Sequence, residues 1–140
     1  MNSKVALIIG AGTSLGSSIT KVFADDNFTV VPVRREGEKL KPLEEEINSK
    51  GGKCFSFSLD ARKEDEVKNF IERVELEIGE IEIAIYNIGA NIKYNLTETS
   101  SKKYFKVWEM ATFGAFLMGR EVAKNMIKRK RGTIIFTCLL

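Results

Sequence analysis

Short apolar runs alternate along the chain with longer segments in which apolar residues recur at helical spacing. A continuous apolar run is typical of a strand buried on both faces, whereas a period of about 3.6 residues indicates an amphipathic helix. The runs predict strands at 5–9, 29–33, 55–59, 81–86 and 133–136. The periodic segments predict helices at 15–24, 39–48 and 63–78 and a long helix at about 101–130.

Strands and helices therefore alternate from end to end, with short connections between them. This order predicts an α/β fold, a doubly wound parallel sheet with right-handed crossovers. We find no internal repeat, low-complexity tract or linker, and 140 residues suit one domain. Residues 1–140 are predicted to form a single domain.

The long predicted helix is apolar around most of its circumference between Tyr104 and Met118. A helix that lies on a sheet needs only one apolar stripe. We therefore predict a neighbour for its second apolar face, either a later helix of the chain or another subunit. In the second case the protein is a homo-oligomer through residues 101–130.

Composition narrows the classes of function. A net charge of +3 is too small to predict nucleic acid or an anionic membrane as a partner, and no apolar run is long enough for a membrane span. The sequence has no histidine, which excludes Ser-His-Asp and Cys-His catalysis and the commonest metal ligand.

Cys54 and Cys138 form no CxxC pair, so we predict no metal site and reduced thiols in a cytoplasmic protein. The basic run at 128–131 is interpreted as the last turn of a helix, where cations complement the helix dipole.

The first predicted strand ends in a glycine turn that opens the first helix. Such a turn lets the backbone approach a pyrophosphate, and the helix N-terminus offers free N–H groups to it. Gly10 would permit the tight turn, Gly16 would let the helix pack on the strand, and Thr13 and Ser14 can offer hydroxyls and amides. The predicted cofactor-binding residues of this turn are Gly10, Gly12, Thr13, Ser14, Leu15 and Gly16. The alternative is a purely structural turn.

Two arginines, Arg34 and Arg35, follow the second predicted strand, where the ribose of a dinucleotide is recognised. A carboxylate at this place bonds the 2′-hydroxyl of NAD, whereas arginine accommodates the 2′-phosphate of NADP. The charge therefore favours NADP(H) over NAD(H), although Glu36 is close enough to weaken the preference. The alternative is a solvated pair of arginines in a loop.

Four segments in the correct order resemble the short-chain dehydrogenase/reductase family over essentially all 140 residues. Residues 10–16 resemble its TGxxxGxG turn, with Ser14 in place of the middle glycine. Residues 59–61 resemble the stretch after the third strand, residues 86–90 are similar to the NNAG motif, and residues 108–114 align with the VNxxG segment of the long helix.

This resemblance implies a Rossmann fold and a set of site residues. The Asp60 side chain would bond the adenine amino group, with Ala61 beside it. Asn87 would brace the central sheet, and Gly89 and Ala90 would lie along the ribose and the nicotinamide side of the cofactor. The implied partners are a nicotinamide dinucleotide and a small carbonyl or alcohol.

The catalytic residues of the family are absent from these 140 residues. The family transfers a proton through the tyrosine of a Tyr-x-x-x-Lys pattern, but Tyr86, Tyr94 and Tyr104 all lack that lysine. Ala111 occupies the place of the family's asparagine, and the sequence ends at the segment that would bear its serine.

We therefore predict the cofactor-binding part of an NAD(P)(H)-dependent oxidoreductase, truncated after the fifth strand and without catalytic residues. The strand at 133–136 would then be an uncovered apolar edge. The alternatives are a non-catalytic dinucleotide-binding module and an inactive remnant that binds nothing.

Overall fold

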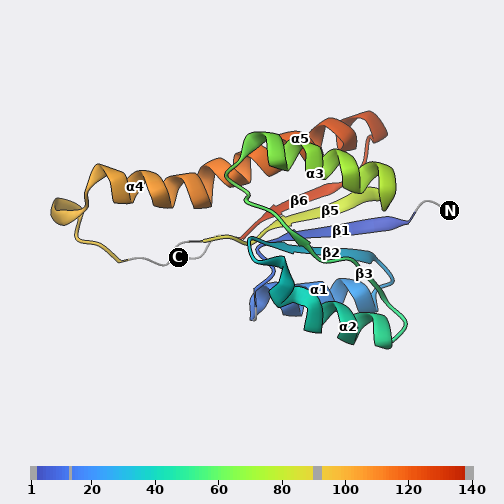
Figure 1. The fold of residues 1–140 in the computed structure, drawn as a ribbon. Coiled ribbons are helices and arrows are strands. Elements are labelled where there is room, and N and C mark those ends of the chain that lie inside the picture. The colour runs from blue at the N-terminus through green and yellow to red at the C-terminus, as the bar shows by residue number, and fades with distance from the viewer. Residues whose placement is uncertain (1–2, 13, 90–92, 138–140) are drawn as a thin grey trace.

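The computed structural model describes residues 3–12, 14–89 and 93–137, which form one parallel sheet with helices on both faces (Figure 1). The strands are β1 (Lys4–Ile9), β2 (Thr29–Arg34), β3 (Lys53–Cys54), β4 (Phe57–Ser58), β5 (Glu80–Tyr86) and β6 (Thr133–Phe136). The helices are α1 (Leu15–Asp25), α2 (Lys41–Ser49), α3 (Glu64–Glu77), α4 (Ser101–Trp108) and α5 (Gly114–Arg129), with short 3-10 turns η1 (Gly37–Leu40) and η2 (Leu96–Glu98).

The strand order is β3-β2-β1-β5-β6, with β4 also paired to β2, and every pairing is parallel. The prediction of a doubly wound parallel sheet is confirmed. Strand β1 lies at the centre, where Ile9 is in register with Val33 of β2 and with Tyr86 of β5. The carboxyl ends of these three strands therefore meet at one edge of the sheet.

The alternating side chains of β1 explain its continuous apolar run. Val5, Leu7 and Ile9 belong to the core between the sheet and helices α3 and α5. Ala6 and Ile8 belong to the core between the sheet and helices α1 and α2. None of the five is more than 1% exposed, so both faces of the strand are buried.

The third predicted strand, 55–59, is wrong in its bounds. Two short strands take its place, β3 and β4, and both pair with β2. Between them the amide of Ser56 donates to Glu44 Oε2 of α2 at 2.7 Å, and the Ser56 hydroxyl bonds to the same oxygen. The interruption lies opposite Pro32 of β2, which has no backbone N–H to donate to the ladder, and Glu44 satisfies the Ser56 amide there.

The buried face of α1 also differs from the apolar stripe in its sequence. Leu15 and Val22 are 45% and 65% exposed, whereas Gly16 and Thr20 are fully buried. A Cβ on Gly16 would lie 2.5 Å from the Gly10 carbonyl oxygen, so this glycine lets the helix approach the end of β1. That close approach turns the small residues of α1, rather than all of its apolar ones, toward the sheet.

The long helix spans the predicted range but is not uniform. Helices α4 and α5 are joined by η3 (Glu109–Phe113), a π-helical segment, and α4 extends well beyond the sheet (Figure 1). Its second apolar face is exposed, with Tyr104 and Phe105 both 63% accessible and Phe116 53%. The neighbour expected on this face stays a prediction.

Strand β6 forms an edge of the described sheet, as the sequence predicts. Ile135 and Phe136 are 41% and 51% exposed. Two of the four basic residues in the run before this strand form ion pairs: Arg129 binds Glu75 at 2.8 Å and Arg131 binds Glu82 at 2.9 Å. These contacts agree with a structural role for that run.

Candidate functional site: a cavity at the carboxyl edge of the sheet

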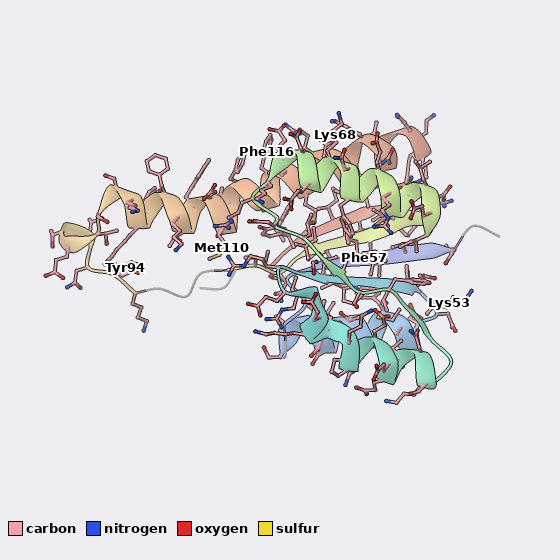
Figure 2. All side chains as sticks on the ribbon, in the orientation of Figure 1. Lys53, Phe57, Lys68, Tyr94, Met110 and Phe116 are labelled. Carbon is pink, nitrogen blue, oxygen red and sulfur yellow. The ribbon has the colours of Figure 1, made fainter. Side chains whose placement is uncertain are left out.

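A cavity of about 610 Å³ opens where the carboxyl ends of β1, β2, β4 and β5 meet. Met110 of η3 closes one side, at the point where the projecting helix reaches the sheet (Figure 2). Its lining residues are Gly10, Gly12, Ser14, Leu15, Gly16, Arg34, Arg35, Glu36, Leu59, Asp60, Ala61, Arg62, Tyr86, Asn87, Ile88, Gly89 and Met110. Eleven of the sequence-predicted site residues are thus brought together, while Thr13 and Ala90 lie outside the described residues.

Gly10 forms the tight turn that follows β1. Its φ is +92°, a conformation that favours glycine, and a Cβ there would lie 2.4 Å from the Asn87 carbonyl oxygen. The amides of Gly10 and Ala11 both donate to the Val33 carbonyl, at 2.8 and 3.0 Å. The turn is therefore fixed against β2 and β5 together.

Gly12 differs from Gly10 and Gly16 in having open space around it. A Cβ on Gly12 would meet no heavy atom of the described residues within 4 Å, whereas one on Gly16 would clash with the backbone of Gly10 and Ala11. Gly12 faces the cavity, so the missing side chain leaves room there rather than relieving a contact inside the protein. A ligand can approach the backbone at this position.

The N-terminus of α1 is open toward the same space. Ser14 occupies the N-cap position but its side chain makes no capping hydrogen bond. Its carbonyl instead accepts hydrogen bonds from the Ser17 and Ser18 hydroxyls, at 2.9 and 3.1 Å. The positive end of the helix dipole is thus left without a side-chain acceptor in the part of the chain that is described, which suits an anion.

Arg34 and Arg35 bring two positive charges to the cavity. Neither has an ion pair among the described residues. Glu36 is paired with Lys39, and that hydrogen bond, more than the two arginines, lowers the pKa of the Glu36 carboxyl. The acid that follows the arginines in the sequence is therefore engaged by another cation.

Asp60 is held by a residue that the sequence analysis missed. The Arg62 guanidinium donates from Nε to Asp60 Oδ1 at 2.9 Å and from Nη2 to Oδ2 at 2.8 Å. These hydrogen bonds lower the pKa of Asp60 to about 2, so the carboxylate is ionised throughout the neutral range. The one sequence feature that could have indicated Arg62 is its position two residues after Asp60.

Asn87 links three segments at the end of the sheet. Its amide nitrogen Nδ2 donates to the Gly10 carbonyl at 3.1 Å, and its Oδ1 accepts from the Thr137 hydroxyl at 2.8 Å. Its backbone amide donates to the Ile9 carbonyl at 2.7 Å. These hydrogen bonds join Asn87 to the end of β1 and to Thr137 after β6.

Tyr86 was not predicted as a site residue, yet it joins β5 to the long helix. Its hydroxyl donates to the Met110 carbonyl of η3 at 2.6 Å. Burial raises the pKa of this phenol well above its usual range, so it stays protonated. Ala111, in the position of the family's asparagine, belongs to the same π-helical segment.

Among the described residues, no group of three His, Cys, Asp or Glu side chains could hold a metal ion. Cys54 is buried, and desolvation raises the pKa of its thiol to about 12. In the same part of the chain, no helix is long and apolar enough to cross a membrane.

Comparison with known proteins decides the family. A sequence profile described as short chain dehydrogenase matches residues 4–139. The chain belongs to the short-chain dehydrogenase/reductase family. Among solved structures of this family, a short-chain dehydrogenase from Rhodopseudomonas palustris has a TM-score of 0.90 and 43% identity, covering 95% of this chain and 62% of that one.

A second family structure, a metagenomic short-chain oxidoreductase in complex with NADP, has a TM-score of 0.92 and 27% identity over 98% of this chain and 62% of that one. A curated relative, the 2-dehydro-3-deoxy-D-gluconate 5-dehydrogenase of Formosa agariphila, is 28% identical over 99% of this chain and 53% of its own length. This chain spans about half the length of the curated relatives that it matches.

Proposed function

We propose that this chain is the dinucleotide-binding part of an NAD(P)(H)-dependent oxidoreductase acting on a small carbonyl or alcohol, with NADP(H) as the preferred cofactor. The observation that carries the proposal is the cavity at the carboxyl edge. An open glycine turn, an uncapped helix N-terminus and two arginines without ion pairs in the described chain line one space. A relative of 27% identity was solved with NADP, which supports the same cofactor class.

The lining residues fit the parts of a nicotinamide dinucleotide, which when bound carries out hydride transfer. The open side of Gly12 and the start of α1 would hold the pyrophosphate. Arg34 and Arg35 would bind a 2′-phosphate through charge-assisted hydrogen bonds. Asp60 would face the adenine, and Gly89 would lie along the ribose and nicotinamide side.

Two alternatives from the sequence keep the fold and change the function: a non-catalytic dinucleotide-binding module, and a remnant that binds nothing. Cofactor titration separates the remnant from the other two. Reading the source gene past the Leu140 codon separates the module from the enzyme. A serine followed by a Tyr-x-x-x-Lys pattern supports the enzyme, and its absence favours the module.

The cofactor preference predicts that Arg34→Ala combined with Arg35→Ala weakens NADPH binding by about ten- to a hundredfold, the loss of one or two hydrogen bonds to a charged group. NADH binding should change by no more than about twofold, because its adenosine ribose carries no 2′-phosphate for the arginines to bind. Fluorescence titration of the reduced cofactors measures both constants.

The double variant Lys102→Ala with Lys103→Ala is the charge-matched control, since both lysines are exposed on α4 outside the cavity. It should bind NADPH like the original chain. Unchanged NADPH affinity in the arginine variant would refute the preference for NADP(H). Absence of binding of either dinucleotide by the original chain would refute the proposed function.

A further inference from the structure

Arg62 lines the cavity but is engaged differently from the two arginines at the end of β2. Its backbone amide and its Nε donate to Asp60 Oδ1, at 3.1 and 2.9 Å, and its Nη2 donates to Oδ2 at 2.8 Å. The side chains of Asp60 and Arg62 are only 15% and 25% exposed. The pair is therefore a fixed element of the wall rather than a mobile surface contact.

The hydrogen bonds to Arg62 determine what Asp60 can still accept. An ionised carboxylate offers roughly four lone-pair positions, about two on each oxygen. The amide and Nε of Arg62 fill both positions on Oδ1, and Nη2 fills one on Oδ2. One acceptor position, on Oδ2, remains for a donor that enters the cavity.

We infer that Arg62 is the positioning residue for base recognition: it holds the Asp60 carboxylate so that Oδ2 accepts a hydrogen bond from the exocyclic amino group of adenine. This inference rests on the proposed dinucleotide function. A carboxylate held in this way favours an amino group and disfavours a carbonyl oxygen at the same place, because two acceptors repel each other. Arg62 therefore contributes to base discrimination through Asp60, not by touching the phosphates.

The bidentate geometry is what a substitution must break. Lysine keeps the positive charge but cannot form the two parallel bonds of a guanidinium, and alanine removes both. Without these bonds the Asp60 carboxylate is free to rotate and to be hydrated. Its Oδ2 then no longer points in one direction, so it distinguishes less well between a base with an amino group and a base with a carbonyl oxygen. Loss of Arg62 should thus reduce discrimination between bases more than it reduces binding of the rest of the dinucleotide.

The test compares NADPH with its hypoxanthine analogue, which carries a carbonyl oxygen where adenine carries the amino group. Both fluoresce through the same reduced nicotinamide, so the same fluorescence titration, run separately with each, gives the two dissociation constants. We expect the original chain to prefer NADPH by about tenfold, the equivalent of one hydrogen bond to a charged group. In Arg62→Ala the preference should fall to about twofold or less, and in Arg62→Lys to about threefold.

Arg73→Ala is the matched control, because Arg73 binds Glu77 on α3 outside the cavity. It should keep the tenfold preference. If Arg62→Ala does not fold, as judged by circular dichroism, Arg62→Lys decides alone. An unchanged preference in a folded Arg62 variant overturns the inference, as does an original chain that binds NADPH and its analogue equally. The proposed function stands in both of those cases, whereas it fails, and the inference with it, if the original chain binds no dinucleotide.

Discussion

At the scale of single residues, two glycines of one turn have separable tasks. Gly10 has a positive φ and is surrounded by protein atoms, so its missing side chain serves the fold. A Cβ on Gly12 would have no neighbour within 4 Å in the described part of the chain, so its missing side chain serves the cavity. Substituting each in turn distinguishes stability from binding.

Gly10→Ala should destabilise the protein by about 2 to 4 kcal/mol, because it adds backbone strain to a clash with the Asn87 carbonyl. Gly12→Ala should change stability by less than about 0.5 kcal/mol. It should nevertheless weaken NADPH binding by about tenfold or more, since the methyl group occupies the space of the pyrophosphate. Urea unfolding and cofactor titration of both variants measure the two effects, and equal losses of stability would contradict the assignment.

At the scale of elements, a hydrogen bond joins the π-helical segment to the sheet. The Tyr86 hydroxyl reaches the Met110 carbonyl at 2.6 Å and passes close to Gly114, the first residue of α5. A Cβ on Gly114 would meet the Tyr86 hydroxyl oxygen first and the Ala61 carbonyl next, at 3.1 Å. The glycine thus makes room for the hydroxyl, and the hydroxyl fixes the wall of the cavity that Met110 forms.

A double-mutant cycle on Tyr86 and Gly114 follows from this contact. Tyr86→Phe should cost about 1 kcal/mol, the net value of one hydrogen bond. Gly114→Ala should lower the free energy of unfolding of the original chain by about 2 kcal/mol or more, through overpacking. In the Tyr86→Phe background the same substitution should lower it by at least about 1 kcal/mol less. Denaturant unfolding followed by circular dichroism gives the four free energies. Additive costs would show that the hydroxyl is not what Gly114 accommodates.

At the scale of the whole molecule, the two faces of β6 are covered unequally. Ile134 packs against the core that contains residues of α3 and α5. Ile135 is in register with Ile85, which belongs to the core on the α1 and α2 side, and yet Ile135 is 41% exposed. An apolar strand at an edge can pair with another chain.

We therefore predict concentration-dependent self-association of the 140-residue chain, and its reduction by Ile135→Lys. A lysine on an edge strand opposes pairing with another strand at little cost to the fold, because the side chain is already part-exposed. Static light scattering should show that Ile135→Lys begins to associate at a severalfold higher concentration than the original chain. Leu76→Lys is the control, since Leu76 is 84% exposed and belongs to α3 rather than to the edge strand. Equal scattering by the two variants would argue against association through the edge.

The sequence was sufficient to predict the fold and the site where a residue's role depends on its neighbours along the chain. Hydrophobic patterning predicted the parallel sheet, and the turn from Gly10 to Gly16 predicted the position of the cavity. It was insufficient where the role depends on contacts between distant segments. Glu44 binds the backbone of the third predicted strand from a separate helix, and Tyr86 meets Met110 from a position 24 residues earlier. Arg62 was missed because a charged residue in a turn is ordinarily solvated, and only its bidentate contact with Asp60 distinguishes it.

The central position of β1 has a consequence for the order of folding. This strand precedes both of its partners in the chain. One of them, β5, ends only at Tyr86, and the bond from Asn87 to the Gly10 carbonyl closes a separation of 77 residues. Contacts between residues far apart in sequence slow folding, because the entropy of closing the intervening loop is lost before the contacts form. During synthesis, β1 therefore remains without its second ladder until β5 has left the ribosome, and its apolar side chains depend for that interval on β2 and α1.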